Sequence, residues 1–311
     1  MKSKRKGVGI KVEATPGTEA TLAGATDYLA AIDFKWDAAA KAVTDEFEYA
    51  SGGYGSRDKF MVSLTRECSF TLPLVGAGAP LGTNFSASWL AVWRACGHAV
   101  TPTTSTNVLV NPISAGEEAA TLNVNEDGFL RKMTFARGSM KWMFEEGKVP
   151  RMAVALMGMY STPADLAMPA ITLPVVPKSV GFSKSNTVVT LGGTTLKVSS
   201  IEIDEVRTHT YRNLANAEDI VPMDCRPTVS MKFELPVAAV KNLYSELETT
   251  TTQTLAIAHG TVVGNRVGFG AARAQLVDMS EGDDRGVIFT TAKFELLPTT
   301  AGNDHYLFTF T

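Results

Sequence analysis

The sequence has little of what enzymes and metal sites require. It contains no GxxxxGK[ST] phosphate loop, no GxSxG nucleophile motif, no HExxH zinc motif and no CxxC pair. Each of its four histidines, His98, His209, His259 and His305, is isolated in its own segment. The acidic pairs lie next to glycine, as is typical of solvated turns. We therefore predict no catalytic residue, no cofactor and no metal site, and we do not expect an enzyme.

Cysteine, targeting signals and long apolar runs are also scarce. Three cysteines, Cys68, Cys96 and Cys225, are too few and too widely spaced for a disulfide framework or a zinc site. The basic run at residues 2–6 is not followed by the apolar stretch of a signal peptide. No apolar run approaches the roughly 20 residues of a membrane span. We expect a protein that assembles in a reducing cytoplasm and has no membrane partner.

Bulk composition is that of an ordinary globular protein. The chain has 311 residues, of which 45% are hydrophobic and 20% charged, and its net charge is −3. This length allows two domains of about 150 residues, each large enough to bury its own core. The charge balance excludes a protein that wraps nucleic acid through a basic surface.

The second half of the chain repeats the plan of the first. Three short segments recur in the same order, and none of the three matches is strong alone. The pairs are Phe70–Leu74 with Phe233–Val237, Ile32–Trp36 with Ile201–Glu205, and the turn Glu146-Gly147 with Glu281-Gly282. Two copies of one module in a chain indicate assembly rather than catalysis, because they halve the number of chains that a closed ring needs.

Turn residues and prolines divide the chain into four parts. We predict an extended N-terminal arm at residues 1–27 that is not a packed element, and a first module at 28–160. A proline-rich linker follows at 161–178, because proline at this density cannot continue a helix or a central strand. The second module is predicted at 179–311.

Each predicted module has a strand, a long polar loop, a second strand, a short helix and a closing strand pair. In the first module the elements are predicted at 32–37, 38–59 (loop), 60–74, 86–97 (helix), 135–145 and 149–160, with an insertion at 98–134. In the second they are predicted at 201–205, 206–227 (loop), 228–237, 238–249 (helix), 268–280 and 286–297, before a last strand at 305–310. The fold class is therefore mainly β, with two tandem β-sandwich or barrel modules, each flanked by one α-helix.

The polar faces of the alternating strands are mostly acidic. Asp33, Glu67, Glu202, Asp204 and Glu234 lie on these faces, with few basic residues among them. In a monomer, such a face is simply the solvent side of a sheet. In a ring it would line a channel, where an acidic wall would repel DNA phosphates. The residues alone favour the solvent face of a monomer and are compatible with the channel wall.

The opening GVGIKVEATPGTEAT resembles the start of the tail tube proteins, or major tail proteins, of long-tailed non-contractile phages. Ile10, Glu13, Thr15, Gly17 and Thr18 carry this similarity, and the order of elements in each module is similar to the tube module. The resemblance implies a β-sandwich whose sheets join edge to edge around a ring, and rings that stack into a tube for DNA delivery. It also implies that the arm and the long loops contact the adjacent ring.

The same resemblance implies the partners and the location. A chain with two modules would form a trimeric, pseudo-sixfold ring, where a chain with one module forms a hexamer. Tape-measure, tail-terminator and baseplate proteins would be its partners in the virion tail, and DNA would pass through without specific binding. A capsid-decoration protein or an adhesin-type β-sandwich binding protein stays open as the alternative, because it would share the composition.

Overall fold

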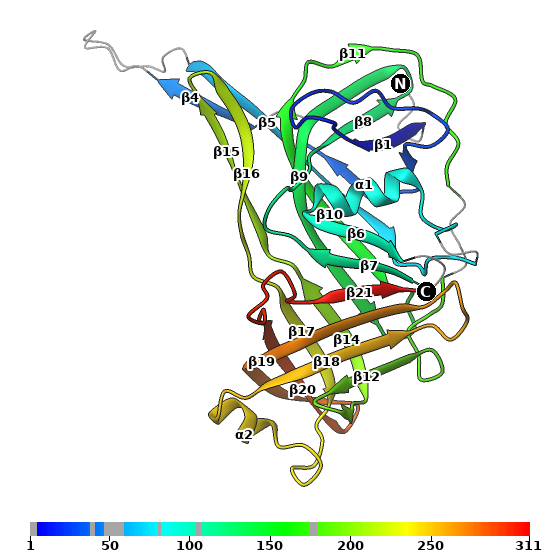
Figure 1. Ribbon diagram of the computed structural model, residues 1–311, viewed down its shortest axis with the longest axis vertical. Helices are drawn as coiled ribbons and strands as arrows, with labels where there is room; N and C mark the ends of the chain where they lie inside the picture. The colour runs from blue at the N-terminus through cyan, green and yellow to red at the C-terminus, as the bar shows by residue number, and fades with distance from the viewer. Residues whose placement is uncertain (1–4, 38–40, 47–58, 80–81, 104–106, 175–178) are drawn as a thin grey trace.

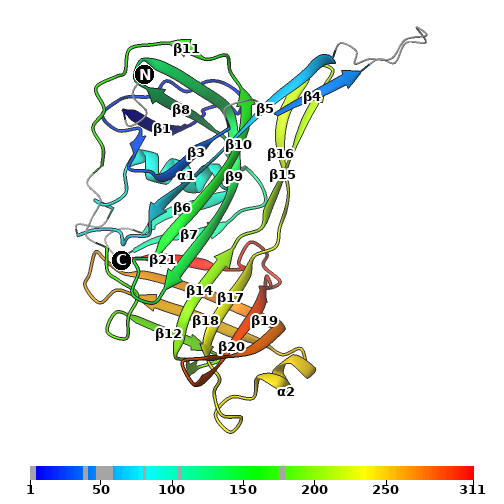
Figure 2. The same cartoon turned by 180° about the vertical axis from the view of Figure 1, so that it is seen from behind.

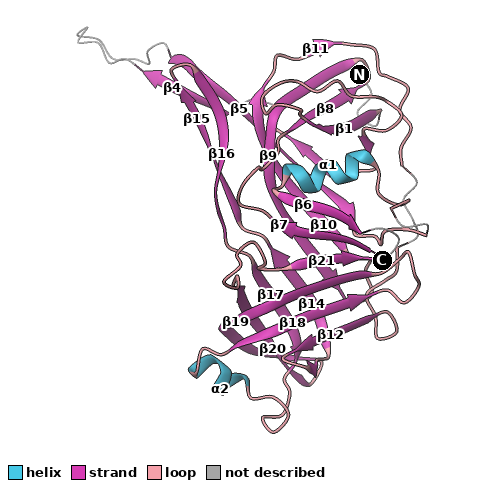
Figure 3. Cartoon of the chain, in the orientation of Figure 1, coloured by secondary structure: helices cyan, strands magenta, loops and turns pink. Residues whose placement is uncertain are grey.

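The computed structural model describes residues 5–37, 41–46, 59–79, 82–103, 107–174 and 179–311; for residues 41–46 and 59–63 it describes the backbone alone. The described chain is mainly β, as predicted, with two short helices (Figure 3). Elements of the first part are β1 Lys6–Val12, β2 Tyr28–Leu29, β3 Ile32–Trp36, β4 Lys41–Glu46, β5 Lys59–Pro73, α1 Ala87–Ala95, β6 His98–Thr103, β7 Asn107–Pro112, β8 Ala120–Glu126, β9 Phe129–Glu145, β10 Arg151–Tyr160 and β11 Ala164–Asp165.

The second part follows the linker. Its elements are β12 Thr187–Leu191, β13 Thr194–Thr195, β14 Val198–Asp204, β15 Arg207–Leu214, β16 Ala217–Cys225, β17 Thr228–Glu234, α2 Leu243–Glu248, β18 Thr252–His259, β19 Val267–Asp284, β20 Val287–Leu296 and β21 Leu307–Phe310. The expected turn at 145–148 joins β9 to β10. The helix predicted at 86–97 is α1, which Ser86 caps by accepting a hydrogen bond from the Trp89 N–H at 3.1 Å.

One antiparallel sheet runs the length of the molecule along one side (Figure 2). Its strands follow the order β3, β5, β10, β9, β14, β17, β20 and β19, and we call it the main sheet. The pairing of β9 with β14 joins the first part of the chain to the second. The main sheet is therefore shared by both parts.

A second layer of strands covers the buried face of the main sheet. The long strands β9 and β19 pass from one layer to the other: their first residues pair with β8 and with β18, and their later residues pair within the main sheet. The C-terminal strand β21 pairs with both β19 and β7, so the second layer also connects the two parts. Helix α1 packs over β1 and β6 in this layer (Figure 1).

A single hydrophobic core fills the space between the layers. Trp93 of α1 stacks on Trp142 of β9 with ring centroids 5.6 Å apart, and Trp142 lies 4.7 Å from Phe308 of β21. These three side chains are fully buried and come from both parts of the chain. Paired strands on both layers therefore make one continuous core that both parts share.

Strand pairings of the first part recur in the second in the same chain order. The corresponding pairs are β1–β2 and β12–β13, β1–β8 and β12–β18, β8–β9 and β18–β19, β9–β10 and β19–β20, β5–β10 and β17–β20, β3–β5 and β14–β17, and β9–β11 and β19–β21. Each part also has a helix after β5 or β17. Within the described residues, the hairpin β6–β7 is the element of the first part that has no counterpart in the second.

Two predicted loops contain strands. The loop predicted at 38–59 includes β4, which pairs with the first residues of β5, although residues 38–40 and 47–58 lie outside the described residues. The loop predicted at 206–227 is the hairpin β15–β16, a two-stranded sheet of its own. Both pairs extend away from the body in the same direction (Figures 1 and 2). The insertion predicted at 98–134 forms β6, β7, β8 and the start of β9.

The predicted N-terminal arm contains a packed strand, which corrects the expectation that it is not a packed element. Val8 and Ile10 of β1 are 4% and 0% exposed, and β1 pairs with β8 along its whole length. Glycine is needed here because a Cβ on Gly9 would lie 2.7 Å from a methyl carbon of Leu22, and one on Gly7 would lie 2.2 Å from Ile171. The small residues that look like a frayed terminus therefore allow close packing.

Candidate functional site on the outer face of the main sheet

The face of the main sheet turned away from the core is a continuous polar surface, which we call the outer face. Cross-strand neighbours in an antiparallel sheet lie on the same face, so the register defines its rows. One row crosses seven strands: Thr71, Ala153, Lys141, Asp204, Thr228, Glu295 and Gln275. The next row contains Arg151, Met143, Glu202, Ser230, Lys293 and Asp278. The rows pass from one part of the chain to the other without interruption.

All five acidic residues selected from the sequence lie on this outer face. Glu202 and Asp204 occupy the two rows above, and Glu234 lies opposite Phe289 in a third. Asp33 and Glu67 line the adjoining hollows described below. Asp33 has a φ of +52°, where the register of β3 against β5 shifts.

Lysines partly neutralise the acidic residues of the outer face. Lys141 lies 2.9 Å from a carboxylate oxygen of Glu202 and 3.0 Å from one of Asp204. The hydrogen bonds that Lys141 donates to these carboxylates, first to Glu202, raise the pKa of Lys141. Lys197 binds Glu234 at 2.8 Å. These exposed pairs add little stability, but they lower the negative potential of the face.

Acidic side chains still outnumber basic ones on the described outer face. The acidic residues are Asp33, Asp37, Glu67, Glu145, Glu202, Asp204, Glu234, Asp278, Asp284 and Glu295. The basic residues are Lys35, Arg137, Lys141, Arg151, Lys197, Lys232 and Lys293. The face is therefore weakly acidic and mixed in charge, rather than a uniform acidic wall.

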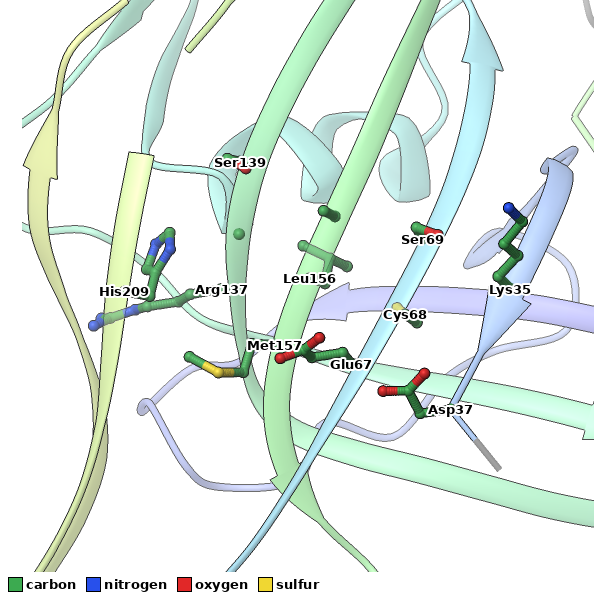
Figure 4. Close-up of a pocket in the computed structure, with 12 residues that line it drawn as sticks. Lys35, Asp37, Glu67, Cys68, Ser69, Arg137, Ser139, Leu156, Met157 and His209 are labelled. Carbon is green, nitrogen blue, oxygen red and sulfur yellow. The ribbon is translucent and has the colours of Figure 1, made fainter. Parts of the chain in front are cut away.

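Two adjoining hollows of about 340 Å³ each lie on the outer face of the first part. Figure 4 shows the one that Asp37, Glu67 and His209 line. Both include the small residues Ser69, Ser139 and Ala155 in their lining, which lie in one row across β5, β9 and β10. Lys35 of β3 lines both hollows from the side. The result is a shallow groove with small residues along its floor and charged residues at its sides.

The far wall of this groove comes from the β15–β16 hairpin. His209 of β15 and Arg137 of β9 face it (Figure 4), and burial lowers the pKa of His209 to about 4, with Arg137 and Arg207 adding to the effect. Arg137 donates to the backbone carbonyls of Ile220 and Glu117 at 2.7 and 2.6 Å. It therefore ties the hairpin to the sheet. The imidazole of His209 is therefore neutral.

A buried ionic cluster holds the base of the hairpin at the junction of the two parts. Glu205, which is 0% exposed, accepts a hydrogen bond from Arg207 Nε at 2.8 Å and another from the Met140 N–H at 3.2 Å. Arg207 also binds Glu117 at 2.5 Å and the Gly97 carbonyl at 3.1 Å. The cluster therefore joins β9, β15 and the segments before β6 and β8.

Burial sets the protonation of this cluster. It raises the pKa of Glu205 to about 7, although Arg207 opposes the shift. It lowers the pKa of His98 to about 3, so that this ring is neutral and hydrogen-bonds Tyr306 Oη at 2.8 Å. Two carboxylates share one guanidinium here, which suits a structural clamp. The sequence analysis did not select this cluster. In the sequence, Glu205 and Arg207 are two residues apart and look like any solvated charge pair.

The five N-terminal residues selected from the sequence have two different environments. Ile10 is in the core, and Glu13 is 4% exposed. The Glu13 carboxylate accepts hydrogen bonds from the Gly17 N–H at 2.6 Å, from Thr121 Oγ1 at 2.8 Å and from the Phe135 N–H at 2.9 Å. Thr15, Gly17 and Thr18 are exposed in the turn that follows. Glu13 therefore fixes a surface turn, and only this turn is available to a neighbouring molecule.

The described residues contain neither a metal-binding cluster nor a membrane-spanning helix. No group of three or more histidine, cysteine, aspartate or glutamate side chains among them could hold a metal ion. None of the helices that the described part of the chain contains is long and apolar enough to cross a membrane.

The chain was also compared with known proteins. No protein-family model matches it, and no curated protein has a significantly similar sequence.

Proposed function

We propose that this chain is a structural subunit that closes into a ring, and that stacked rings form a tube of the phage tail tube type. The observation that carries this proposal is the repeated order of strand pairings, combined with the edge-to-edge junction of β9 and β14. A module joined to its own copy along a sheet leaves an equivalent edge for the next copy, and closed rings are the usual outcome of such contacts.

The repeated pairings support two tandem copies of one sandwich module. Phe70 and Phe233, which match in sequence, are both buried and occupy the same place in their halves: Phe70 pairs with Val154 on β10, and Phe233 with Thr290 on β20. We therefore keep the modules predicted at 28–160 and 179–311, and we add β1 to the first.

The edges of the main sheet favour ring closure. Among the described residues, β3 pairs with β5 alone, and the last residues of β19 pair with β20 alone. Exposed sheet edges promote association, and closing a sheet on itself removes them. Three chains joined β19 to β3 would give six modules in a pseudo-sixfold ring. Six chains per ring is the alternative count.

The outer face suits the wall of a DNA channel in such a ring. Its acidic excess would repel phosphate groups, while its ion pairs keep the potential weak enough for DNA to pass without being held. By the resemblance, the tube would belong to the virion tail, assemble in the host cytoplasm and contact tape-measure, tail-terminator and baseplate proteins.

Electron microscopy and mass measurement of the purified protein test this proposal. We expect rings or tubes with a central hole, and a smallest assembled species of three times the chain mass of 33.2 kDa. A species of six times that mass would keep the ring and contradict the trimer. Isolated single-chain particles at all concentrations would refute ring formation and favour a capsid-decoration or adhesin-type protein.

A further inference from the structure

An exposed apolar surface lies at one end of the long axis, around α2 (Figure 1). Val237, Val240, Tyr244 and Ile288 are 68%, 61%, 51% and 57% exposed. Together with Leu235 and Leu243, three of them line a hollow of about 350 Å³. We call this surface the α2 face. In soluble proteins, neighbouring apolar side chains that are this exposed mark contact sites.

The corresponding segment of the first half is buried. Leu74 and Ala77 hold the positions that Val237 and Val240 hold after the matching FxLP motif, and they are 2% and 0% exposed. The β18–β19 loop, residues 260–266, covers them: Gly78 N–H donates to the Gly264 carbonyl at 2.8 Å. The second half therefore covers, within the chain, the surface equivalent to the α2 face.

The first half contains the counterpart of the covering loop. The turn between β8 and β9, Asp127-Gly128, connects the strands that correspond to β18 and β19. It lies at the opposite end of the long axis, near the N-terminus and β11 (Figures 1 and 2). Beside it, Leu166 is 53% exposed and its N–H donates to the Gly128 carbonyl at 2.9 Å. We call this region the turn end.

At the position of Val240, the size of the α2 face matches the length of the turn. The covering loop has seven residues between its strands and the turn has two, while Ala239 and Val240 on the α2 face replace the smaller Gly76 and Ala77. A shorter turn leaves room for larger side chains. The α2 face is bordered by exposed Glu248 and by Glu281, which contacts Tyr244. At the turn end, Arg5 forms an ion pair with Asp127 of the turn at 3.1 Å.

We propose that the α2 face binds the turn end of a second copy of this chain, head to tail. This inference rests on the proposed ring and gives it a specific second contact beyond the β19–β3 edge. Within the chain, the β18–β19 loop of the second half covers the segment that follows β5 in the first half. The proposed contact repeats this arrangement between chains: the β8–β9 turn of the next chain covers the segment that follows β17. Such a contact uses two different surfaces, so it continues around a ring until the ring closes.

Two variants and a control test this contact by sedimentation velocity. Val240→Asp places a charge on the α2 face, and Leu166→Asp places one at the turn end. Both side chains are more than half exposed, so the fold should tolerate the change. Val262→Asp is the control, because Val262 is 67% exposed and belongs to the β18–β19 loop rather than to the α2 face or the turn end. We expect both test variants to remain single chains and the control to assemble like the parent.

Mixing the two test variants gives the decisive result. Each retains one intact surface, so the mixture should form a species of two chains and nothing larger. Full assembly of Val240→Asp or of Leu166→Asp would overturn the contact, and so would a mixture that stays as single chains. In either case, rings formed by the parent protein would still support the proposed function. A parent protein that never assembles would overturn both.

Discussion

Removing Arg207 should destabilise the protein in a manner that depends on pH. In Arg207→Met, two buried carboxylates, Glu205 and Glu117, lose their shared cation. Breaking a buried ion pair by removing one partner costs about 3–5 kcal/mol. At about 2 °C per kcal/mol for a chain of this size, the thermal midpoint should fall by roughly 6–10 °C at pH 8.

The sign of the pH effect follows from the protonation of Glu205. Its pKa is about 7 in the fold and 4.5 ordinarily, so the folded state binds the proton more tightly. That contribution, about 3 kcal/mol, is fully present below pH 4.5 and is lost as pH rises through 7. Without Arg207, the charged form of Glu205 is even less favourable in the folded state. The variant should therefore lose much of the free energy of unfolding at pH 8. At pH 5 the loss should shrink to about 1–2 kcal/mol, because only the hydrogen bonds of Arg207 are then missing.

Scanning calorimetry at the two pH values measures this difference. Arg212→Met is the matched control, because Arg212 lies on the same hairpin in an exposed pair with Asp219. It should leave the midpoint unchanged at both pH values. If Arg207→Met loses the same stability at pH 5 as at pH 8, or no more than the control, the buried charges do not hold the hairpin as we argue.

Three further changes test the core, the N-terminal strand and the outer face. Trp93→Ala should cost about 3–5 kcal/mol in thermal unfolding, since its ring is fully buried in the shared core; an unchanged midpoint would contradict the packing. Deleting residues 1–20 removes β1 and should lower the midpoint in circular dichroism, whereas Thr15→Ala with Thr18→Ala should not. Reversing Glu202, Asp204 and Glu234 to lysine should permit ring assembly but retain labelled duplex DNA at low salt, unlike the parent; equal retention would exclude this face from the channel.

Local patterns in the sequence predicted the regular elements well. The alternation in residues 64–72 and 228–234 gave β5 and β17, because one face of each strand is buried and the other is wet. Arg66, a charged residue at an inward position of β5, is 2% exposed, and its guanidinium lies over the rings of Trp36 and Tyr160. The helix predicted at 86–97 corresponds to α1, Ala87–Ala95.

Elements without an apolar face were not predictable in this way. The hairpin β15–β16 exposes most of both faces, so its sequence has no alternation and looked like a loop. Only Ile220 of this hairpin is fully buried, against Phe135 and Ala119 of the first half. The shared core depends on the pairings β9–β14 and β7–β21, which join residues far apart in sequence and leave no local signal.

The hairpin β6–β7 makes the junction within the chain different from the junction we propose between chains. Within the chain, the halves join on both layers, because β9 pairs with β14 and β21 pairs with β7. The second half has only residues 249–251 between α2 and β18, so it offers no counterpart of β7 to a neighbour. A contact between chains would thus lack one of the two strand pairings. In the proposed contact, the α2 face would supply apolar area where that pairing is missing, in keeping with the exposure of Val237 and Val240, whose counterparts Leu74 and Ala77 in the first half are covered.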